Sequence, residues 1–447
     1  MRKPVPAKTK IKFKKPLMQP MSNRTKERAK TALIIVLAIS GVLLAVNSGL
    51  FQLGASRKQT TASGQASSGS QTGTAGSVAV NIAGPYVIAV TDASGSHCAL
   101  TYDGAELVQA YDGLSAYLGE ALGSAGDPEQ ITESEWVAAL KGTGAYFDFV
   151  YAQPIYLLSA SLGTSMTSSA SQHSARRFCL SLDDGSVYLY YQRARDGEYY
   201  KCTTAVNTAA VTAKLGDWKP NGAAFMFETD YDYDKVDGCF LILDGQPQVH
   251  AISGQNPLGA DFDASALTAK LGMNSYLASS YKEGDGTRVY VDGSCTLRAS
   301  ADGKVTFKNS EPSGADGYEK TDIKAALRTA NQIVSATIAA SGGIASAVMD
   351  GIRYDDSTDT YTVSYDYQVT GLPVSVGPGS AAVITVTGGS VTGAELYYRE
   401  YTYTGADDSP LPAVQAMAVA QAKGGGMPQL CYVDSGDTVT AGWIIVK

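Results

Sequence analysis

Residues 31–53, TALIIVLAISGVLLAVNSGLFQL, are the run of the sequence that is long and apolar enough to cross a membrane. The run has no Asp, Glu, Lys or Arg, and as a helix its 23 residues would extend roughly 35 Å at about 1.5 Å per residue. Because the hydrocarbon core of a bilayer is about 30 Å thick, this segment predicts a single transmembrane helix. The organisation of the rest of the chain follows from it.

The charges on either side of the apolar run predict its orientation. Residues 1–30 hold eleven Lys and Arg and one acid, Glu27, whereas Arg57 and Lys58 are the only charged residues between the run and Tyr86. Segments rich in Lys and Arg stay on the cytoplasmic side of a membrane. We therefore expect a single-pass protein of the cell membrane, with a cytoplasmic N-terminus and nearly 400 residues outside.

A cleaved secretory signal peptide is the alternative to a retained anchor, because both begin with basic residues followed by an apolar run. The apolar part of a signal peptide is typically about 7–15 residues long, which is shorter than residues 31–53. The best cleavage sequence, Val46-Asn47-Ser48, is imperfect, and no Cys follows it directly for lipid attachment. These details favour a retained anchor.

Composition and hydrophobic periodicity divide the remaining chain into a linker and three folded regions. The linker consists mainly of Ser, Gly, Thr, Ala and Gln, a composition typical of flexible tethers. The folded regions combine strand patterns with amphipathic helices. We expect an α+β protein with a cytoplasmic basic tail at 1–30, a transmembrane helix at 31–53, a flexible Ser/Gly linker at 54–80, an α+β domain at 81–164, a mainly β domain at 175–315 and an α+β C-terminal domain at 316–447.

Short motifs locate several helices within these regions. In residues 106–122 apolar side chains recur at spacings of three and four, which predicts one buried stripe. Thr132 to Glu135 has the pattern of a capping box, and Pro154-Ile155 can begin another helix. Residues 321–340 again form one apolar face, and an Ala-rich helix at 411–423 is ended by three glycines.

The charge of the part beyond the membrane restricts its partners. After Thr31 the chain has 24 basic and 42 acidic residues, a net charge of −18, while residues 1–30 carry +10. An acidic surface repels polyanions, so we expect no nucleic-acid partner. The basic tail can be attracted to anionic lipid, although a topology signal alone explains it.

All six cysteines follow the predicted membrane segment, where disulfides can form. Their spacing is wide and irregular, and six cysteines allow fifteen connectivities, so the sequence defines no disulfide framework. We expect mainly small buried apolar residues, with one or two disulfides, at Cys98, Cys179, Cys202, Cys239, Cys295 and Cys431.

Three patterns that could carry chemistry are incomplete. The carboxylates of Asp230, Asp232 and Asp234 begin like a calcium loop, but the required glycine and the final acid of that loop are absent. Ser279 and Lys282 fit the S-x-x-K pattern of acylating enzymes without its companion motifs. His97, His173 and His250 are too far apart in sequence to define a metal site. We therefore expect no catalytic residues, no metal and no cofactor.

Five segments, together with the single N-terminal anchor, carry a resemblance to a known family. They are EWVAALKGTGAYFDFVYAQPIYLL at 135–158, TVSYDYQVTGLPV at 362–374, ELYYREYTY at 395–403, LPAVQAMAVAQA at 411–422 and GWIIV at 442–446. In pattern they resemble the YycH and YycI regulatory proteins of Gram-positive bacteria, and the segment at 135–158 is similar to the YycH branch in particular. The resemblance covers the anchor and about half of the outer part.

The resemblance implies a PepSY/YycI-like C-terminal domain without catalysis. It also implies association with a membrane sensor histidine kinase of the two-component system that controls cell-wall metabolism, partly through transmembrane helices, and possible association with a second YycH/YycI-type protein. This chain differs from the family in its basic tail, its long linker and its six cysteines. Since a long linker weakens rigid coupling to the outer part, the transmembrane helix is the expected contact.

The transmembrane helix has one face of small residues that could form this contact. On a period of 3.6 residues, Gly41, Ala45, Ser48 and Gly49 fall along one side, whereas most of the leucines lie elsewhere. Small residues allow helices to approach closely in lipid. Small residues are also common in membrane helices in general, which is the alternative explanation for this face.

The resemblance, together with the predicted anchor, implies a non-catalytic, membrane-anchored extracytoplasmic regulator of a sensor histidine kinase. A cell-wall-binding module or an envelope enzyme of undefined chemistry is the first alternative, and a passive surface protein is the second. The absence of a nucleophile, base or metal pattern argues against the enzyme. Only partner identification separates a regulator from a passive protein.

Overall fold

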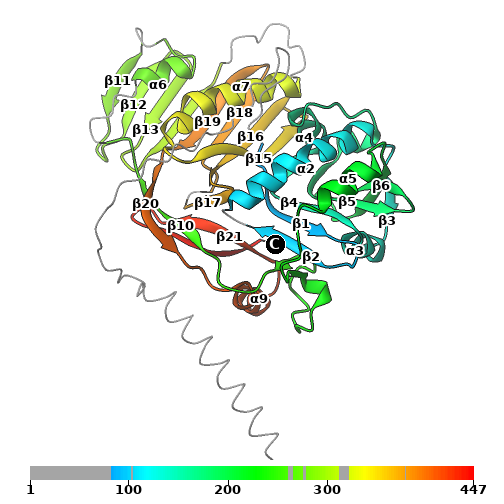
Figure 1. Ribbon diagram of the computed structural model, residues 1–447. Coiled ribbons are helices and arrows are strands. Elements are labelled where there is room, and N and C mark those ends of the chain that lie inside the picture. Colours follow the sequence, from blue (N-terminus) through cyan, green and yellow to red (C-terminus); the bar gives the residue numbers. More distant parts are fainter. Residues whose placement is uncertain are drawn as a thin grey trace, which may run out of the picture. The chain divides into compact units, whose positions relative to one another are not determined.

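The computed structural model describes residues 82–101, 104–259, 265–274, 278–311, 322–377 and 379–446 (Figure 1). The predicted basic tail, transmembrane helix and linker lie outside these residues. Within the described ranges, no helix combines the length and the apolar character needed to span a membrane. The mixture of helices and mostly antiparallel strands confirms the predicted α+β class for the described part of the chain.

A seven-stranded antiparallel sheet organises the first part of the described chain. Strand β1 is buried along its whole length, and most of β4 is buried as well, so these strands are nearly continuous apolar runs. The side chains of the two faces enter two separate apolar clusters. In spatial order the strands are β2 (His97–Thr101), β1 (Pro85–Thr91), β4 (Gly144–Pro154), β5 (Ser174–Asp183), β6 (Ser186–Arg193), β7 (Tyr199–Thr203) and β3 (Glu129–Ile131).

Helices cover both faces of this seven-stranded sheet (Figure 1). On one face, α2 (Ala105–Ser124) buries its leucine stripe together with α4 (Ile155–Ser161) and α5 (Thr208–Leu215). On the other face, α3 (Glu133–Lys141) buries Trp136. The predicted capping box is confirmed, because Thr132 and Glu135 exchange side-chain and backbone hydrogen bonds. Helix α5 was not predicted from the sequence.

An eleven-stranded sheet organises the C-terminal half. Helix α7 (Ile323–Ala336) packs on one face through its apolar stripe, with α8 (Ile338–Ser341) following it. The strands in spatial order are β11 (Ser279–Lys282), β12 (Arg288–Asp292), β13 (Cys295–Ala299), β14 (Lys304–Asn309), β19 (Ser390–Tyr397), β18 (Ala382–Thr387), β16 (Thr360–Val369), β17 (Leu372–Val376), β21 (Met427–Asp434) and β22 (Val439–Val446), with β15 (Ser346–Asp355) also paired to β16.

Smaller elements complete the described chain. Helix α6 (Ser265–Lys270) adds apolar residues to the core of the eleven-stranded sheet, and α9 (Ala413–Ala422) lies beside β21. In residues 224–228 the two-residue β8 is followed directly by a 3₁₀ turn. The remaining elements are β8 (Ala224–Phe225), η2 (Met226–Glu228), β9 (Leu241–Ile242), β10 (Val249–Gln255), β20 (Glu400–Asp408) and the 3₁₀ turn η1 (Ser169–Gln172).

The sheets cross the domain boundaries that the sequence suggests. Strands β4 and β5 lie on opposite sides of the expected boundary at 165–174, yet they are neighbours in one sheet. Strand β14 pairs with β19 and β10 pairs with β20, across the expected boundary at 316. The expected regions 81–164, 175–315 and 316–447 are therefore not separate sheets. Pairing between distant strands leaves no local pattern in the sequence, so changes in composition alone suggested domain boundaries at these positions.

The cysteines are free thiols in the structure, without a disulfide among them. Cys98, Cys179, Cys202, Cys239 and Cys431 are buried, as the small-apolar interpretation predicts, and Cys295 is partly exposed.

Candidate functional site

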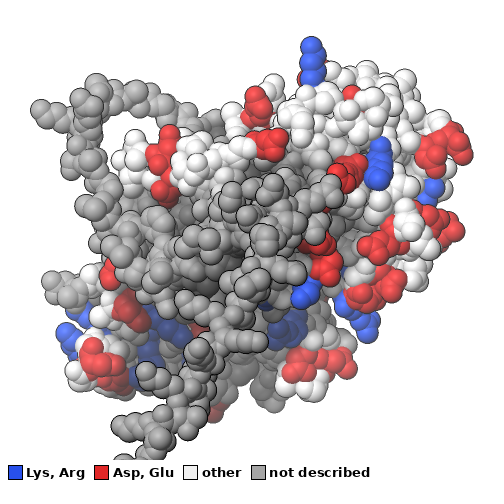
Figure 2. All heavy atoms as spheres, turned by 90° about the horizontal axis from the view of Figure 1, so that it is seen from below, with Lys and Arg blue, Asp and Glu red and all other residues white. Residues whose placement is uncertain are grey.

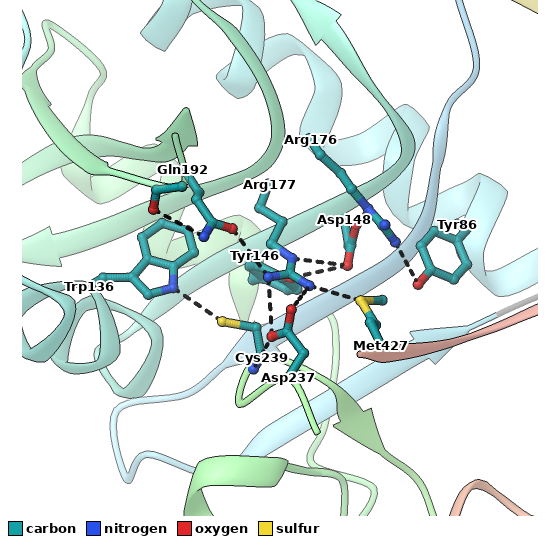
Figure 3. A network of polar contacts seen from close by, with 11 residues as sticks. Tyr86, Trp136, Tyr146, Asp148, Arg176, Arg177, Gln192, Asp237, Cys239 and Met427 are labelled. Carbon is teal, nitrogen blue, oxygen red and sulfur yellow. Dashed lines mark hydrogen bonds and ion pairs between the residues drawn. The ribbon is translucent and has the colours of Figure 1, made fainter. Parts of the chain in front are cut away.

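Arg177 is the centre of a buried polar network between segments that are far apart in sequence (Figure 3). Its side chain is 6% exposed. Nη1 and Nη2 donate to the two carboxylate oxygens of Asp237 at 3.2 and 2.8 Å, and Nε lies 3.5 Å from Asp148 Oδ2. Nη2 also lies 2.8 Å from the sulfur of Met427. We call Asp148, Arg176, Arg177, Asp237 and Met427 the arginine junction.

Local irregularities in β4 and β5 bring the charges of the arginine junction together. Asp148 and Arg177 are directly opposite each other in the antiparallel register, and the β5–β6 register shifts between Ala175 and Arg177. Consecutive side chains of a regular strand point to opposite faces, and a bulge changes that alternation. Arg176 Nε also donates to Asp148, at 2.6 Å from Oδ1, so both arginines contact one carboxylate.

A loop and a strand from distant parts of the chain close the arginine junction. Asp237 belongs to the loop between η2 and β9, and Met427 begins β21. The two segments touch through their backbones, since Gly426 N donates to the carbonyl of Lys235 at 2.9 Å. Gly425 allows this approach, because a Cβ there would lie 2.5 Å from the carbonyl oxygen of Lys235. The glycines that end α9 therefore also seat β21 against the loop.

The electrostatics of the arginine junction favour the charged forms of Arg177 and Asp237. Burial acts to lower the pKa of Arg177, but Tyr146 and the carboxylates of Asp237 and Asp148 outweigh it and raise the pKa well above its usual value. Burial acts to raise the pKa of Asp237, but the charge and hydrogen bonds of Arg177 outweigh it and lower the pKa. Two arginines face two aspartates, so the junction is balanced in charge.

The groups around the arginine junction give it a structural role and no evident chemistry. Burial raises the pKa of the Cys239 thiol to about 11, and this sulfur accepts a hydrogen bond from Trp136 Nε1 at 3.2 Å. Such a thiol stays protonated near neutral pH and is a poor nucleophile. A cavity of about 10 Å³ adjoins Tyr86, Tyr146, Asp148, Met427 and Trp443, which is room for about one water molecule. The junction ties the seven-stranded sheet to the loop and to β21.

A second polar cluster connects the two large sheets elsewhere. Tyr151 of β4 donates from its hydroxyl to Asp366 Oδ2 of β16 at 2.8 Å. Asp350 of β15 lies close by, because Ser380 Oγ donates to Asp350 Oδ2 at 3.0 Å and the adjacent Ala381 N–H donates to Asp366 Oδ1 at 3.3 Å. We call Tyr151, Asp350 and Asp366 the carboxylate pair cluster. Burial raises the pKa values of both carboxylates. Carboxylates with perturbed pKa values are typical of functional sites, so this cluster is the second candidate.

The residues that the sequence singled out do not come together as a site. Within the described ranges, no group of three His, Cys, Asp or Glu side chains could hold a metal ion. Asp234 accepts a hydrogen bond from Gln421, and Ser279 and Lys282 lie exposed on strand β11. The histidines lie apart: His97 is buried between Thr91 and Glu228, His173 contacts Tyr191 and the exposed His250 contacts Asp407. The predicted helix face at Gly41, Ala45, Ser48 and Gly49 lies outside the described residues.

Sequence reasoning missed both clusters, although a signal was present. Asp148 interrupts the apolar strand AYFDFVY, and Arg176-Arg177 begins the apolar run RRFCLSL. A charge inside a buried strand is rare unless it is paired. That pattern predicts a buried ion pair, but it does not name Asp237, which follows sixty residues later in an irregular loop.

Comparisons with known proteins identify the fold. No protein-family model matches the sequence, and neither does any curated protein. The structure is similar to the crystal structure of YycH from Bacillus subtilis, with a TM-score of 0.57 and 11% sequence identity. The match covers 81% of this chain and 94% of that chain. At this identity the likeness establishes the fold alone: the described part of this chain has a YycH-like fold.

Proposed function

We propose that this protein is a non-catalytic, membrane-anchored regulator of a sensor histidine kinase that controls cell-wall metabolism. The observation that carries the proposal is the YycH-like fold, which extends over 94% of the YycH chain and therefore over more than one shared motif. The apolar run at 31–53 supports a membrane location beside such a kinase. Inward-facing charges that are committed to each other in the arginine junction support a structural role over catalysis.

The charge of the described surface supports a protein partner over a nucleic acid. Figure 2 shows Asp and Glu side chains spread over the described surface, with Lys and Arg among them. Beyond Thr31 the acids outnumber the basic residues by 42 to 24. Such a surface repels the phosphates of nucleic acids and the acidic polymers of an envelope.

Crosslinking in the native membrane followed by mass spectrometry tests the proposed function. A photo-reactive amino acid at Leu37, within the apolar run, should capture a membrane histidine kinase, and a second YycH/YycI-type protein is a further expected product. A matched probe at Gln65 in the linker controls for non-specific capture. Recovery of peptidoglycan fragments without a kinase would support a cell-wall-binding module and contradict the proposal. Recovery of no specific partner would support a passive surface protein.

The proposal requires that the N-terminus is cytoplasmic and the bulk of the chain is outside. A cysteine-accessibility or reporter-fusion assay should place Lys10 inside and Tyr397 outside, because eleven basic residues precede the apolar run. The matched measurement is the mass of the N-terminal peptide from purified membranes. A mature chain that begins near Gly49 would show cleavage after Ser48 and contradict the anchor.

The small-residue face of the anchor should take part in kinase recognition. Replacing Gly41, Ala45 and Ser48 with Leu should leave insertion intact, because hydrophobicity rises, but should weaken copurification of the kinase. Close helix contacts and interhelical hydrogen bonds in membranes contribute about 0.6–2 kcal/mol each. The matched control replaces Leu33, Leu37 and Leu44, which lie mostly on other faces, with Ile. Full retention of the kinase by the Leu variant would place the contact outside this face.

A further inference from the structure

The carboxylate pair cluster lies where strand β4 of the seven-stranded sheet meets β15 and β16 of the eleven-stranded sheet. Asp350 occupies an irregularity of the β15–β16 pairing, because the register shifts between Met349 and Gly351. A bulge of this kind redirects the extra side chain. Asp350 and Asp366 are neighbours, because the consecutive residues Ser380 and Ala381 donate hydrogen bonds to one carboxylate each. The Oδ1 atom of Asp350 is buried without a hydrogen-bond partner among the described residues.

The hydrogen bonds of the carboxylate pair cluster come from neutral groups. Asp366 accepts from the Tyr151 hydroxyl at 2.8 Å and from the backbone N–H of Ala381 at 3.3 Å, and Asp350 accepts from Ser380. Neither carboxylate forms an ion pair with a described Lys, Arg or His. Arg177, the centre of the arginine junction, directs its guanidinium to Asp237 and Asp148 instead.

The other titratable groups around the pair are also uncharged near neutral pH. Tyr151 on β4 is one of these groups. Its pKa is raised strongly by burial and then by the charge of Asp366. The second group is Tyr365 on β16, whose pKa is raised by burial and by Asp350. The third group is Cys431 on β21, and burial raises the pKa of its thiol to about 12. Among the described residues, no cation balances two negative charges on the pair.

Two partly buried carboxylates without a cation do not both ionise readily, because each charge disfavours the other. Burial raises the pKa of Asp350. Burial, followed by the charge of Asp350, raises the pKa of Asp366 to about 7.

We propose that Asp350 and Asp366 hold one proton between them, and that its loss to water as the pH rises weakens the contact between β4 and strands β15 and β16. The reaction is a simple acid dissociation, which replaces one negative charge in the pair by two. Tyr151 is the group that transmits the change, because its hydrogen bond to Asp366 joins the two sheets. The proposal is independent of the partner that the chain regulates.

The sign of the pH effect follows from the proton count. The folded chain keeps the extra proton up to about pH 7, whereas an unfolded Asp loses it near its ordinary value of 3.8. The folded state thus binds more protons than the unfolded state in this window, so the free energy of unfolding falls as the pH rises through it. Above the window the contribution is constant.

Thermal unfolding of the full-length protein in lipid nanodiscs, from about pH 5 to about pH 8, tests the proton and its sign. The Asp350→Asn variant removes one charge and keeps an oxygen for Ser380. Its Tm relative to wild type should rise with pH and exceed the wild-type value by about 2–4 °C or more at the upper end. The matched control, Asp232→Asn in an exposed loop, should follow the wild-type curve. Parallel curves for wild type and Asp350→Asn would overturn the proposal.

Two further measurements on the same full-length samples test the site and the loosening of the sheets. Infrared spectroscopy should show a protonated carboxyl band near neutral pH that is lost in Asp366→Asn and retained in Asp232→Asn. Hydrogen exchange at one alkaline pH should be slower in β4 and β15 of Asp350→Asn than in wild type, with exchange in β12 unchanged. Absence of the carboxyl band would overturn the shared proton, and equal exchange in β4 and β15 would overturn the loosening. If Asp366→Asn does not fold, the Asp350→Asn results decide.

Discussion

Replacing Arg177 with Met is expected to lower the free energy of unfolding by about 3–5 kcal/mol, because it leaves the partly buried Asp237 carboxylate without its paired cation and removes one of the two arginines that contact Asp148. Asp237 would lose both of its guanidinium hydrogen bonds, and Asp148 would keep those from Arg176 and from the Tyr146 hydroxyl. The methionine fills much of the space of the arginine stem, so the effect isolates the charge. Chemical denaturation of the full-length protein in detergent, followed by tryptophan fluorescence, measures this loss of stability. Trp136 reports on the region because it lies in the same apolar cluster as Met427 of the arginine junction.

The matched control for Arg177 is Arg298, which forms an ion pair with Glu283 on the surface. Arg298→Met should change the free energy of unfolding by about 0–1 kcal/mol, because exposed ion pairs contribute little. The double variant Arg177→Met with Asp237→Asn should recover part of the lost stability by removing the stranded charge. Equal effects of the Arg177 and Arg298 variants would show that the arginine junction does not stabilise the fold.

Replacing Arg399 with Met should have an effect of similar size in the eleven-stranded sheet, about 3–5 kcal/mol. The side chain of Asp434 is fully buried, and it accepts two hydrogen bonds from Arg399, at 2.7 and 2.9 Å. After the substitution, the Tyr401 hydroxyl at 2.7 Å and the backbone N–H of Gly436 would remain as donors, but no cation would face the charge. The same denaturation experiment measures the loss.

Lys304 provides the control for Arg399 within the same sheet. Its ammonium lies 3.2 Å from Glu395, and both side chains are largely exposed. Lys304→Met should therefore change stability by about 0–1 kcal/mol. Adding Asp434→Asn to Arg399→Met should restore part of the stability. If the double variant is as unstable as the single variant, the loss arises from packing of the arginine stem and not from the unpaired carboxylate.

Local sequence patterns determined much of the secondary structure. The leucine stripe at 106–122 became α2, the capping box at Thr132 begins α3, and the three glycines after residue 423 end α9. These signals act over a few residues, because helix periodicity and capping depend on neighbours three or four positions away. The same patterns supported the α+β class and the resemblance to the YycH and YycI proteins. The structure has a fold similar to that of YycH.

Only the tertiary structure decided how the strands are shared between sheets. Strand β5 completes a sheet with β4 across a Ser/Thr-rich segment, and β14 joins β19 across more than eighty residues. Such pairings depend on backbone hydrogen bonds and on faces buried against distant elements, which no local window of sequence contains. For the same reason the sequence marked Asp148 and Arg177 as charges within apolar strands but could not identify Asp237 or the neighbours of Asp366. A charged residue within an apolar strand indicates that a partner of opposite charge is needed, because an unpaired buried charge is costly, and the fold alone determines which residue is that partner.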